Sequence, residues 1–194
     1  MKNAQHNKKG IPMITDSIFR EYDIRGVIGR DINANGFSLL GSAFATYVEH
    51  QAETCKIVVG YDGRLTSQEL VSALIQGLTH SGAEVINIGC GPTPMLYFAS
   101  YHLGATAAMM VTGSHNPPEY NGLKMVVGNK ALMAEEVKII GEMAQDHDFR
   151  TETGAHQEDL DLAHTYADTL LKDFKTYYPP TFQRIAWDAG NGAT

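Results

Sequence analysis

Residues 105–124 read ATAAMMVTGSHNPPEYNGLK, and this is the most informative stretch of the sequence. Small and apolar residues from Ala105 to Val111 predict a buried strand, and the glycine, asparagine and prolines that follow predict a turn. The turn carries Ser114 beside His115, and Lys124 follows once the chain runs back. A hydroxyl, an imidazole and a lysine beyond a strand end are typical of a nucleophile. From the residues alone, a reactive serine and a serine that only caps the turn both remain open.

On both sides of this stretch, strand-like runs alternate with helical patterns. This alternation predicts a three-layer α/β/α domain with a mainly parallel mixed sheet, followed by an incomplete second domain of the same type. Ligands of such sheets bind at the carboxyl ends of the strands, where Asp62 and Ser114 should both lie. The expected strands are 56–60, 83–88, 105–111 and 122–127, and the expected helices are 36–51, 66–81, 134–145, 160–174 and one beginning near residue 93.

Two of these helices have specific start signals. Thr66 and Glu69 have the spacing of a capping box, with Thr66 as the N-cap. Thr93 suits the N-cap of the next helix, with Pro94 at the first helical position.

Composition limits the classes of function. The chain has 194 residues, of which 43% are hydrophobic and 19% charged, as in a soluble globular protein. A net charge of −7 without a basic, aromatic-rich stripe argues against a nucleic-acid partner. No apolar run is long enough to span a membrane or to form a signal peptide. Cys55 and Cys90 form no disulfide framework and are predicted to be buried thiols in a reducing cytoplasm.

The chain divides into three predicted parts. Residues 1–14 are polar and predict a flexible tail, and residues 15–155 form the first domain. Residues 156–194 are expected to begin a second, truncated domain. An apolar run at 185–187 would then be exposed, so this part is expected to dock on the first domain, to fray, or to mediate self-association.

Five blocks of the sequence resemble one family in their order and spacing. The chain resembles the α-D-phosphohexomutases, most closely the bacterial phosphomannomutase/phosphoglucomutase branch. The blocks are FREYDIRG at 19–26, GYDGR at 60–64, GPTP at 91–94, the serine loop at 112–124 and DAGNG at 188–192.

The resemblance implies a phosphoserine mechanism. Ser114 would pass a phosphoryl group to a hexose monophosphate and recover one from the hexose 1,6-bisphosphate intermediate, so that phosphate moves between C1 and C6. Lys124 and Arg25 would act in acid/base and electrostatic roles, and Tyr22 would approach the sugar phosphate. His115 would act directly or shape the loop, although adjacent side chains rarely face each other. The enzyme would be cytoplasmic, with small sugar phosphates as its ligands.

The resemblance also implies Mg²⁺, held in part by a phosphate oxygen on Ser114. The family's other metal ligands and its sugar-selecting parts lie in regions beyond residue 194. The isolated chain is therefore expected to be inactive.

Less specific interpretations remain for several of these residues. Arg25 could hold the N-terminal segment through Asp23 or Asp62, and Tyr22 could be a packed aromatic. Asp62 and Arg64 are expected to brace the site or the fold, since an Asp-Gly turn needs no catalytic explanation.

Three other functions remain open. A phosphoglucosamine mutase or phosphopentomutase relative would share the serine loop. A non-catalytic module could bind phosphate or a partner. A serine hydrolase is disfavoured, because the GxSxG motif and an assignable acid-histidine set are missing.

Overall fold

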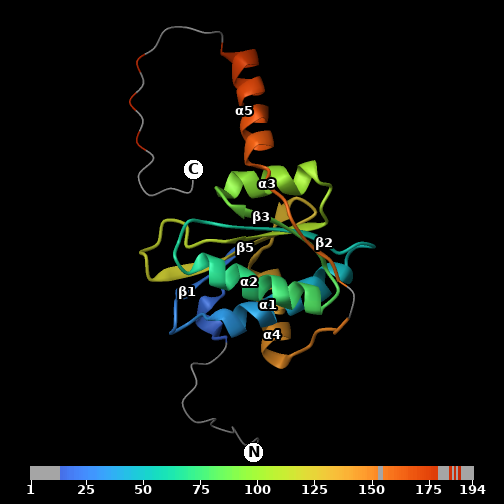
Figure 1. The fold of residues 1–194 in the computed structure, drawn as a ribbon. Coiled ribbons are helices and arrows are strands. Elements are labelled where there is room, and N and C mark those ends of the chain that lie inside the picture. Colours follow the sequence, from blue (N-terminus) through green and yellow to red (C-terminus); the bar gives the residue numbers. More distant parts are fainter. Residues whose placement is uncertain (1–13, 153–154, 179–183, 185, 187, 189–194) are drawn as a thin grey trace, which may run out of the picture.

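The computed structural model describes residues 14–152, 155–178, 184, 186 and 188 (Figure 1). A short 3-10 helix, η1 (Asp16–Ile18), precedes the first strand. The strands are β1 (Asp23–Val27), β2 (Lys56–Tyr61), β3 (Glu84–Cys90), β4 (Ala107–Val111), β5 (Tyr120–Val127), β6 (Lys130–Ala131) and β7 (Gln157–Asp159). The helices are α1 (Ala34–Glu49), α2 (Ser67–His80), α3 (Thr93–His102), α4 (Ala134–Asp146) and α5 (Ala163–Tyr177).

The strands form one mixed sheet in the order β1-β5-β4-β2-β3-β7, with β6 paired to β5. The pairs β4–β2, β2–β3 and β3–β7 are parallel, whereas β5 is antiparallel to β1, β4 and β6. Among the described strands, β5 therefore runs alone against the others. The short loop after β4 causes this reversal, because a parallel return would need a longer crossover. The predicted mainly parallel mixed sheet is confirmed.

Helices cover both faces of the sheet, with α1, α2 and α4 on one face and α3 on the other (Figure 1). Successive side chains of a strand point to opposite faces. Accordingly, Ile57 and Val59 belong to the cluster beneath α1 and α2, and Val58 belongs to the cluster beneath α3. The sheet is thus the middle of three layers.

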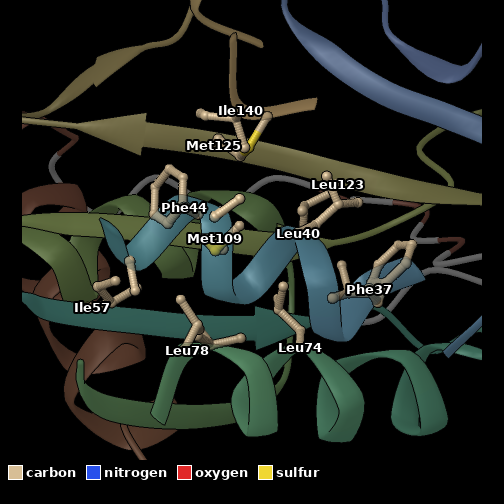
Figure 2. Packing of buried hydrophobic residues seen from close by; sticks show 14 of the residues in the cluster. Phe37, Leu40, Phe44, Ile57, Leu74, Leu78, Met109, Leu123, Met125 and Ile140 are labelled. Atoms are coloured by element: carbon tan, nitrogen blue, oxygen red, sulfur yellow. The ribbon is translucent and has the colours of Figure 1, made fainter. Parts of the chain in front are cut away.

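Helix α1 lies at the centre of the larger cluster. Figure 2 shows its side chains, among them Phe44 and Leu40, between residues of the sheet such as Met109 and residues of α2 such as Leu78. These four side chains are 0–1% exposed. Their burial supplies much of the free energy that holds the layers together.

Thr66 is confirmed as the N-cap residue of α2, but the predicted capping box and the predicted start of α3 need correction. Helix α2 begins after Thr66, but the Thr66 side chain makes no capping hydrogen bond. Its Oγ1 instead accepts a hydrogen bond from Asn121 Nδ2, so a tertiary contact replaces the capping box. Helix α3 begins at Thr93 with Pro92 as its N-cap residue, one position earlier than predicted.

Helix α5 has no buried residue along Ala163–Tyr177. Near its start, Tyr166 contacts Phe98 of α3 with ring centroids 5.4 Å apart. Farther along, Leu170 and Phe174 are 51% and 58% exposed. The predicted amphipathic pattern of α5 is therefore present, but only the first part of the helix packs against other described residues.

The proposed domain limits stay a prediction. Strand β7, which follows the boundary at residue 156, pairs with β3. The described residues do not include 1–13 or most of 179–194. Most of the predicted tail, of the apolar run at 185–187 and of the block at 188–192 therefore lies outside them. Within the described part, no helix is both long and apolar enough to cross a membrane.

Candidate functional site

A groove of about 1250 Å³ opens between the N-terminal segment, the loop after β4, strand β5 and helix α4. We call it the serine groove. It is lined by all five side chains predicted to act on substrate: Tyr22, Arg25, Ser114, His115 and Lys124. These residues are up to about one hundred positions apart in sequence, and the β1–β5 pairing together with the loop after β4 brings them together.

The loop holds Ser114 in an unusual backbone conformation. Ser114 has a φ of +52°, in the left-handed region that side-chain-bearing residues rarely adopt. Its N–H donates to Thr112 Oγ1 at 2.9 Å, and the Asn116 N–H donates to the Gly113 carbonyl at 3.1 Å. The loop is therefore a compact, internally bonded turn that presents the serine at the groove.

Ser114 and His115 are in contact despite being adjacent. The distance between Ser114 Oγ and His115 Nδ1 is 3.2 Å, within hydrogen-bonding range. Adjacent side chains were expected rarely to face each other productively; these two are in contact, and a direct chemical role for His115 stays a prediction. The imidazole can accept from the hydroxyl or donate to it, depending on its tautomer.

A buried carboxylate joins the two predicted cations. Asp23 lies opposite Lys124 in the β1–β5 register, and Asp23 and Arg25 share one face of β1. Asp23 Oδ2 is 2.9 Å from Arg25 Nη2 and 3.5 Å from Lys124 Nζ. Arg25 also donates to the Thr112 carbonyl. The salt bridge to Asp23 that was left open for Arg25 exists, and Arg25 nevertheless lines the groove.

Two residues that follow β2, Asp62 and Arg64, hold the serine loop in place through hydrogen bonds, as predicted. Asp62 Oδ2 accepts from the Gly113 N–H at 3.1 Å, and Asp62 Oδ1 accepts from Ser67 Oγ at 2.6 Å. Arg64 donates to four backbone carbonyls of the loop and its exit, at distances of 2.6–3.1 Å.

Asn121 is a site residue that sequence reasoning missed. Its side chain is fully buried, and Nδ2 donates to the hydroxyls of Thr66 at 3.0 Å and Ser67 at 2.9 Å. It thereby ties the start of β5 to the start of α2. An asparagine before a glycine signals a turn, and only its burial within a strand reveals this contact.

Cys90 lies at the carboxyl end of β3 and is exposed, so the prediction of two buried thiols is wrong for this residue. Partial burial and the charge of Asp62 raise the pKa of Cys90. Cys55 is half-buried, and burial raises its pKa to about 11. Both thiols are therefore largely protonated at neutral pH and are poor nucleophiles.

Among the described residues, no group of three or more His, Cys, Asp or Glu side chains could hold a metal ion. The carboxylates of Asp23 and Asp62 are already engaged by cations and N–H groups. A phosphate on Ser114 would add oxygen ligands of the kind that Mg²⁺ prefers. The described residues thus fit a metal only as a partial site.

Comparisons with known proteins agree on one family. The sequence profile of "Phosphoglucomutase/phosphomannomutase, alpha/beta/alpha domain I" matches residues 16–151. The phosphomannomutase/phosphoglucomutase of Pseudomonas aeruginosa is 38% identical over 181 residues, which are 93% of this chain and 38% of that protein. The phosphoglucomutase of Neisseria gonorrhoeae is 36% identical over 180 residues, covering 92% of this chain and 38% of the relative.

A solved structure gives the same result. The crystal structure of a phosphoglucomutase/phosphomannomutase family protein from Burkholderia thailandensis superimposes with a TM-score of 0.78 at 38% sequence identity. The match covers 83% of this chain and 36% of that one. The chain thus spans little more than a third of the length of the proteins it matches.

Proposed function

The chain belongs to the phosphoglucomutase/phosphomannomutase family, and from this premise we propose that it supplies the phosphoserine part of a hexose phosphate mutase. The substrates in this proposal are the 1- and 6-phosphates of glucose and mannose. The observation that carries the proposal is the serine groove, where Ser114 shares one cavity with Arg25 and Lys124. A nucleophile beside two cations is the arrangement that phosphoryl transfer requires.

The proposed reaction has two balanced transfers. In the first, the bond between phosphorus and Ser114 Oγ breaks as a sugar hydroxyl bonds to the phosphorus; the sugar hydroxyl gives up a proton and Ser114 Oγ takes one up, and the reverse proton exchange accompanies the second transfer. The product is a hexose 1,6-bisphosphate, which reorients in the groove. In the second transfer its other phosphate returns to Ser114, and the released sugar oxygen regains a proton. The net result is migration of phosphate between C1 and C6.

Arg25 and Lys124 take different parts in this scheme. Arg25 has two fixed partners and a permanent charge, which suits it to oppose the charge that develops on the phosphoryl oxygens. Lys124 has a single carboxylate contact at 3.5 Å and a side chain that is 25% exposed, so its amine has room to exchange a proton with the sugar hydroxyl.

His115 and Tyr22 complete the groove. The contact between His115 Nδ1 and Ser114 Oγ orients the serine before it accepts a phosphoryl group. Tyr22 is 56% exposed on the groove wall, so the ring is not simply packed in the core and can contact the sugar.

We further propose Mg²⁺ as the metal and hexose 1,6-bisphosphate as the intermediate that also charges Ser114. When bound, the cation would neutralise charge on the transferring phosphate. The chain covers 38% of the length of the Pseudomonas aeruginosa relative. The isolated chain is expected to be inactive, and self-association through residues 156–194 and a cytoplasmic location remain predictions.

A chimera tests the proposal. This chain would replace the matching region of the Pseudomonas aeruginosa relative, and conversion of glucose 1-phosphate to glucose 6-phosphate would be measured with Mg²⁺ present. We expect turnover from the chimera, none from the isolated chain, and none from a Ser114→Ala chimera. Ser72→Ala, an exposed serine of α2 outside the serine groove, is the matched control and should keep full activity. Turnover that survives Ser114→Ala would refute the proposal.

A further inference from the structure

We infer that Arg64 is a positioning residue for phosphoryl transfer, which holds Ser114 in its left-handed conformation and itself binds no phosphate. This inference rests on the proposed function, because it concerns how Ser114 is presented.

The conformation of Ser114 needs support from outside the residue. A residue with a side chain at φ of +52° is unfavourable unless its surroundings fix it there. Ser114 is one of three described non-glycine residues with positive φ, and the others, Asn129 and His147, lie in a hairpin turn and at a helix end. Asparagine tolerates this region well, whereas serine does so less readily. Ser114 therefore calls for a specific stabilising contact.

Arg64 makes that contact through the backbone. Its Nη2 donates to the carbonyls of Ser114 at 3.1 Å and Asn116 at 2.6 Å. Its Nη1 donates to the carbonyls of Pro117 at 2.8 Å and Tyr120 at 3.0 Å. One guanidinium thus binds the serine itself, the turn after it and the point where the chain enters β5.

These contacts use every N–H group on the two terminal nitrogens of the side chain. A guanidinium has five N–H groups. Four serve the loop carbonyls, and the fifth, on Nε, lies 3.4 Å from Asp62 Oδ2. The terminal nitrogens therefore have no N–H group left for a phosphate on Ser114, although the Arg64 guanidinium lies against the serine loop. Arg25 and Lys124 line the serine groove, and in the proposed function they are the cations that meet the phosphate.

Asp62 fixes the position of Arg64 relative to the fold. The same carboxylate oxygen that faces Arg64 Nε accepts from the Gly113 N–H, and the other accepts from Ser67 at the start of α2. The guanidinium lies where a Cβ on Gly113 would be. The loop is therefore held against a rigid helix end by a planar, multiply bonded group.

Lysine cannot replace this group. A lysine keeps the positive charge, but its three donors radiate from one nitrogen and cannot reach four carbonyls in a fixed plane. Arg64→Lys therefore removes the contacts that position the loop while it keeps the positive charge.

The first experiment measures amide hydrogen exchange and the three-bond coupling that reports φ of Ser114 in the 194-residue chain. In Arg64→Lys we expect exchange in the loop 113–121 to accelerate by about 10- to 100-fold and the Ser114 coupling to change, with exchange in β4 unaltered. Arg150→Lys is the matched control. Arg150 binds Glu49, Glu152 and the Ser81 carbonyl, away from the serine groove. Replacing it should weaken the domain as a whole, so exchange should become faster in β4 and in the loop together. An unchanged Ser114 coupling in Arg64→Lys overturns the inference.

A measurement on the unaltered chain covers the case in which Arg64→Lys does not fold. Inorganic phosphate is titrated while the side-chain N–H signals of the arginines are followed. We expect the Arg25 signals to shift and the Arg64 signals to stay in place. A shift of the Arg64 signals as large as that of Arg25 would mean that Arg64 binds phosphate, contrary to the inference.

A kinetic experiment connects the contact to function. In the chimera, Arg64→Lys should lower kcat by about 10- to 100-fold and leave KM for glucose 1-phosphate within about twofold. A raised KM with unchanged kcat would identify Arg64 as a substrate-binding residue and overturn the inference. If Ser114 of the unaltered chimera takes no phosphate, the proposed function fails, and the exchange and coupling data still decide whether Arg64 positions the loop.

Discussion

Asp23 is the residue on which the charge balance of the serine groove depends. It is 6% exposed, and one of its oxygens faces both Arg25 and Lys124. A buried carboxylate is tolerated only when it is paired and hydrogen-bonded, and the cations here meet that condition. In return, Asp23 holds both cations on the strands that line the groove. The three groups together carry one net positive charge, which favours a phosphate dianion over a neutral sugar.

Replacing Asp23 by asparagine should therefore affect stability as well as the site. Asp23→Asn leaves the buried Arg25 without its carboxylate, and we expect the free energy of unfolding to fall by about 3 kcal/mol. Urea unfolding of the two proteins measures the difference. Glu142→Gln, which removes a solvent-exposed partner of Lys138, is the control and should cost less than about 0.5 kcal/mol. Equal stability of Asp23→Asn and the parent chain would show that the carboxylate is not needed to hold Arg25.

At the scale of elements, helices α1 and α2 cross in close contact. Gly77 of α2 lies against the backbone of Ser38, and Gly41 of α1 lies against the backbone of Leu74. A side chain at either glycine would meet backbone atoms, which cannot move as a side-chain tip can. The two helices can cover one face of the sheet together because these glycines let them approach.

Gly77→Ala should force the helices apart. Although alanine favours helix more than glycine, the overpacking should outweigh this gain and lower the free energy of unfolding by about 1–3 kcal/mol. Gln76→Ala, at an exposed neighbouring position of α2, is the matched control and should change stability by less than about 0.5 kcal/mol. A thermal melt in which Gly77→Ala is as stable as Gln76→Ala would contradict the close packing described here.

The turn after β1 predicts a pH dependence. Asp31 Oδ2 accepts from the Val27 N–H at 2.9 Å, and its carboxylate pairs with Arg30 at 2.8 Å. The hydrogen bond from Arg30 and that from the Val27 backbone lower the pKa of Asp31 to about 2, from 3.8. A folded-state pKa below the unfolded value means that the stabilisation is present above pH 3.8 and is lost as the pH falls toward 2.

Asp31→Asn tests this dependence. The parent chain should exceed the variant in stability by no more than about 1 kcal/mol at pH 6, because Arg30 is largely exposed to solvent. The difference should shrink through pH 4 to 2 and vanish near pH 2. Urea unfolding at several pH values measures it. A difference that stays constant from pH 6 to pH 2 would mean that Asp31 titrates normally.

Elements whose side chains follow a regular pattern of burial were predicted from the sequence, whereas an element that depends on pairing between distant residues was not. Strands β2 and β4 and helix α2 were predicted within a few residues, because burial imposes a period on their apolar side chains. Strand β1 was not predicted, because two of its five residues, Asp23 and Arg25, are charged. Their mutual pairing, and that with Lys124, allows them to be buried, and this pairing depends on the β1–β5 register, which local sequence does not specify.

At the scale of the whole molecule, the site forms where the chain reverses direction. Asp62 and Ser114 follow the parallel strands β2 and β4, as the α/β pattern predicted. Strand β5 then runs back and places Lys124 beside β1, so that the N-terminal segment closes one side of the serine groove. In Figure 1, α5 extends away from this body beyond α3. The described residues thus build the serine side of a site and leave the helix that follows largely unpacked.

The family resemblance identified the residues of the groove, whereas the geometry that connects them came from the fold. The five predicted residues line one cavity, but the sequence did not indicate that Ser114 and His115 touch or that Asp23 joins both cations. The first contact is made by a residue with a left-handed backbone, and strand register places Asp23 opposite Lys124 for the second. Both are properties of the folded chain.

Peptide mapping can show whether Ser114 carries the phosphoryl group. The chimera with the Pseudomonas aeruginosa relative would be incubated with hexose 1,6-bisphosphate labelled in its phosphates and with Mg²⁺, digested, and analysed by mass spectrometry. We predict one labelled phosphate on Ser114, and when unlabelled glucose 1-phosphate is added this label should be replaced by unlabelled phosphate. A chimera that turns over glucose 1-phosphate while Ser114 stays unlabelled, or while another residue carries the label, would contradict the account.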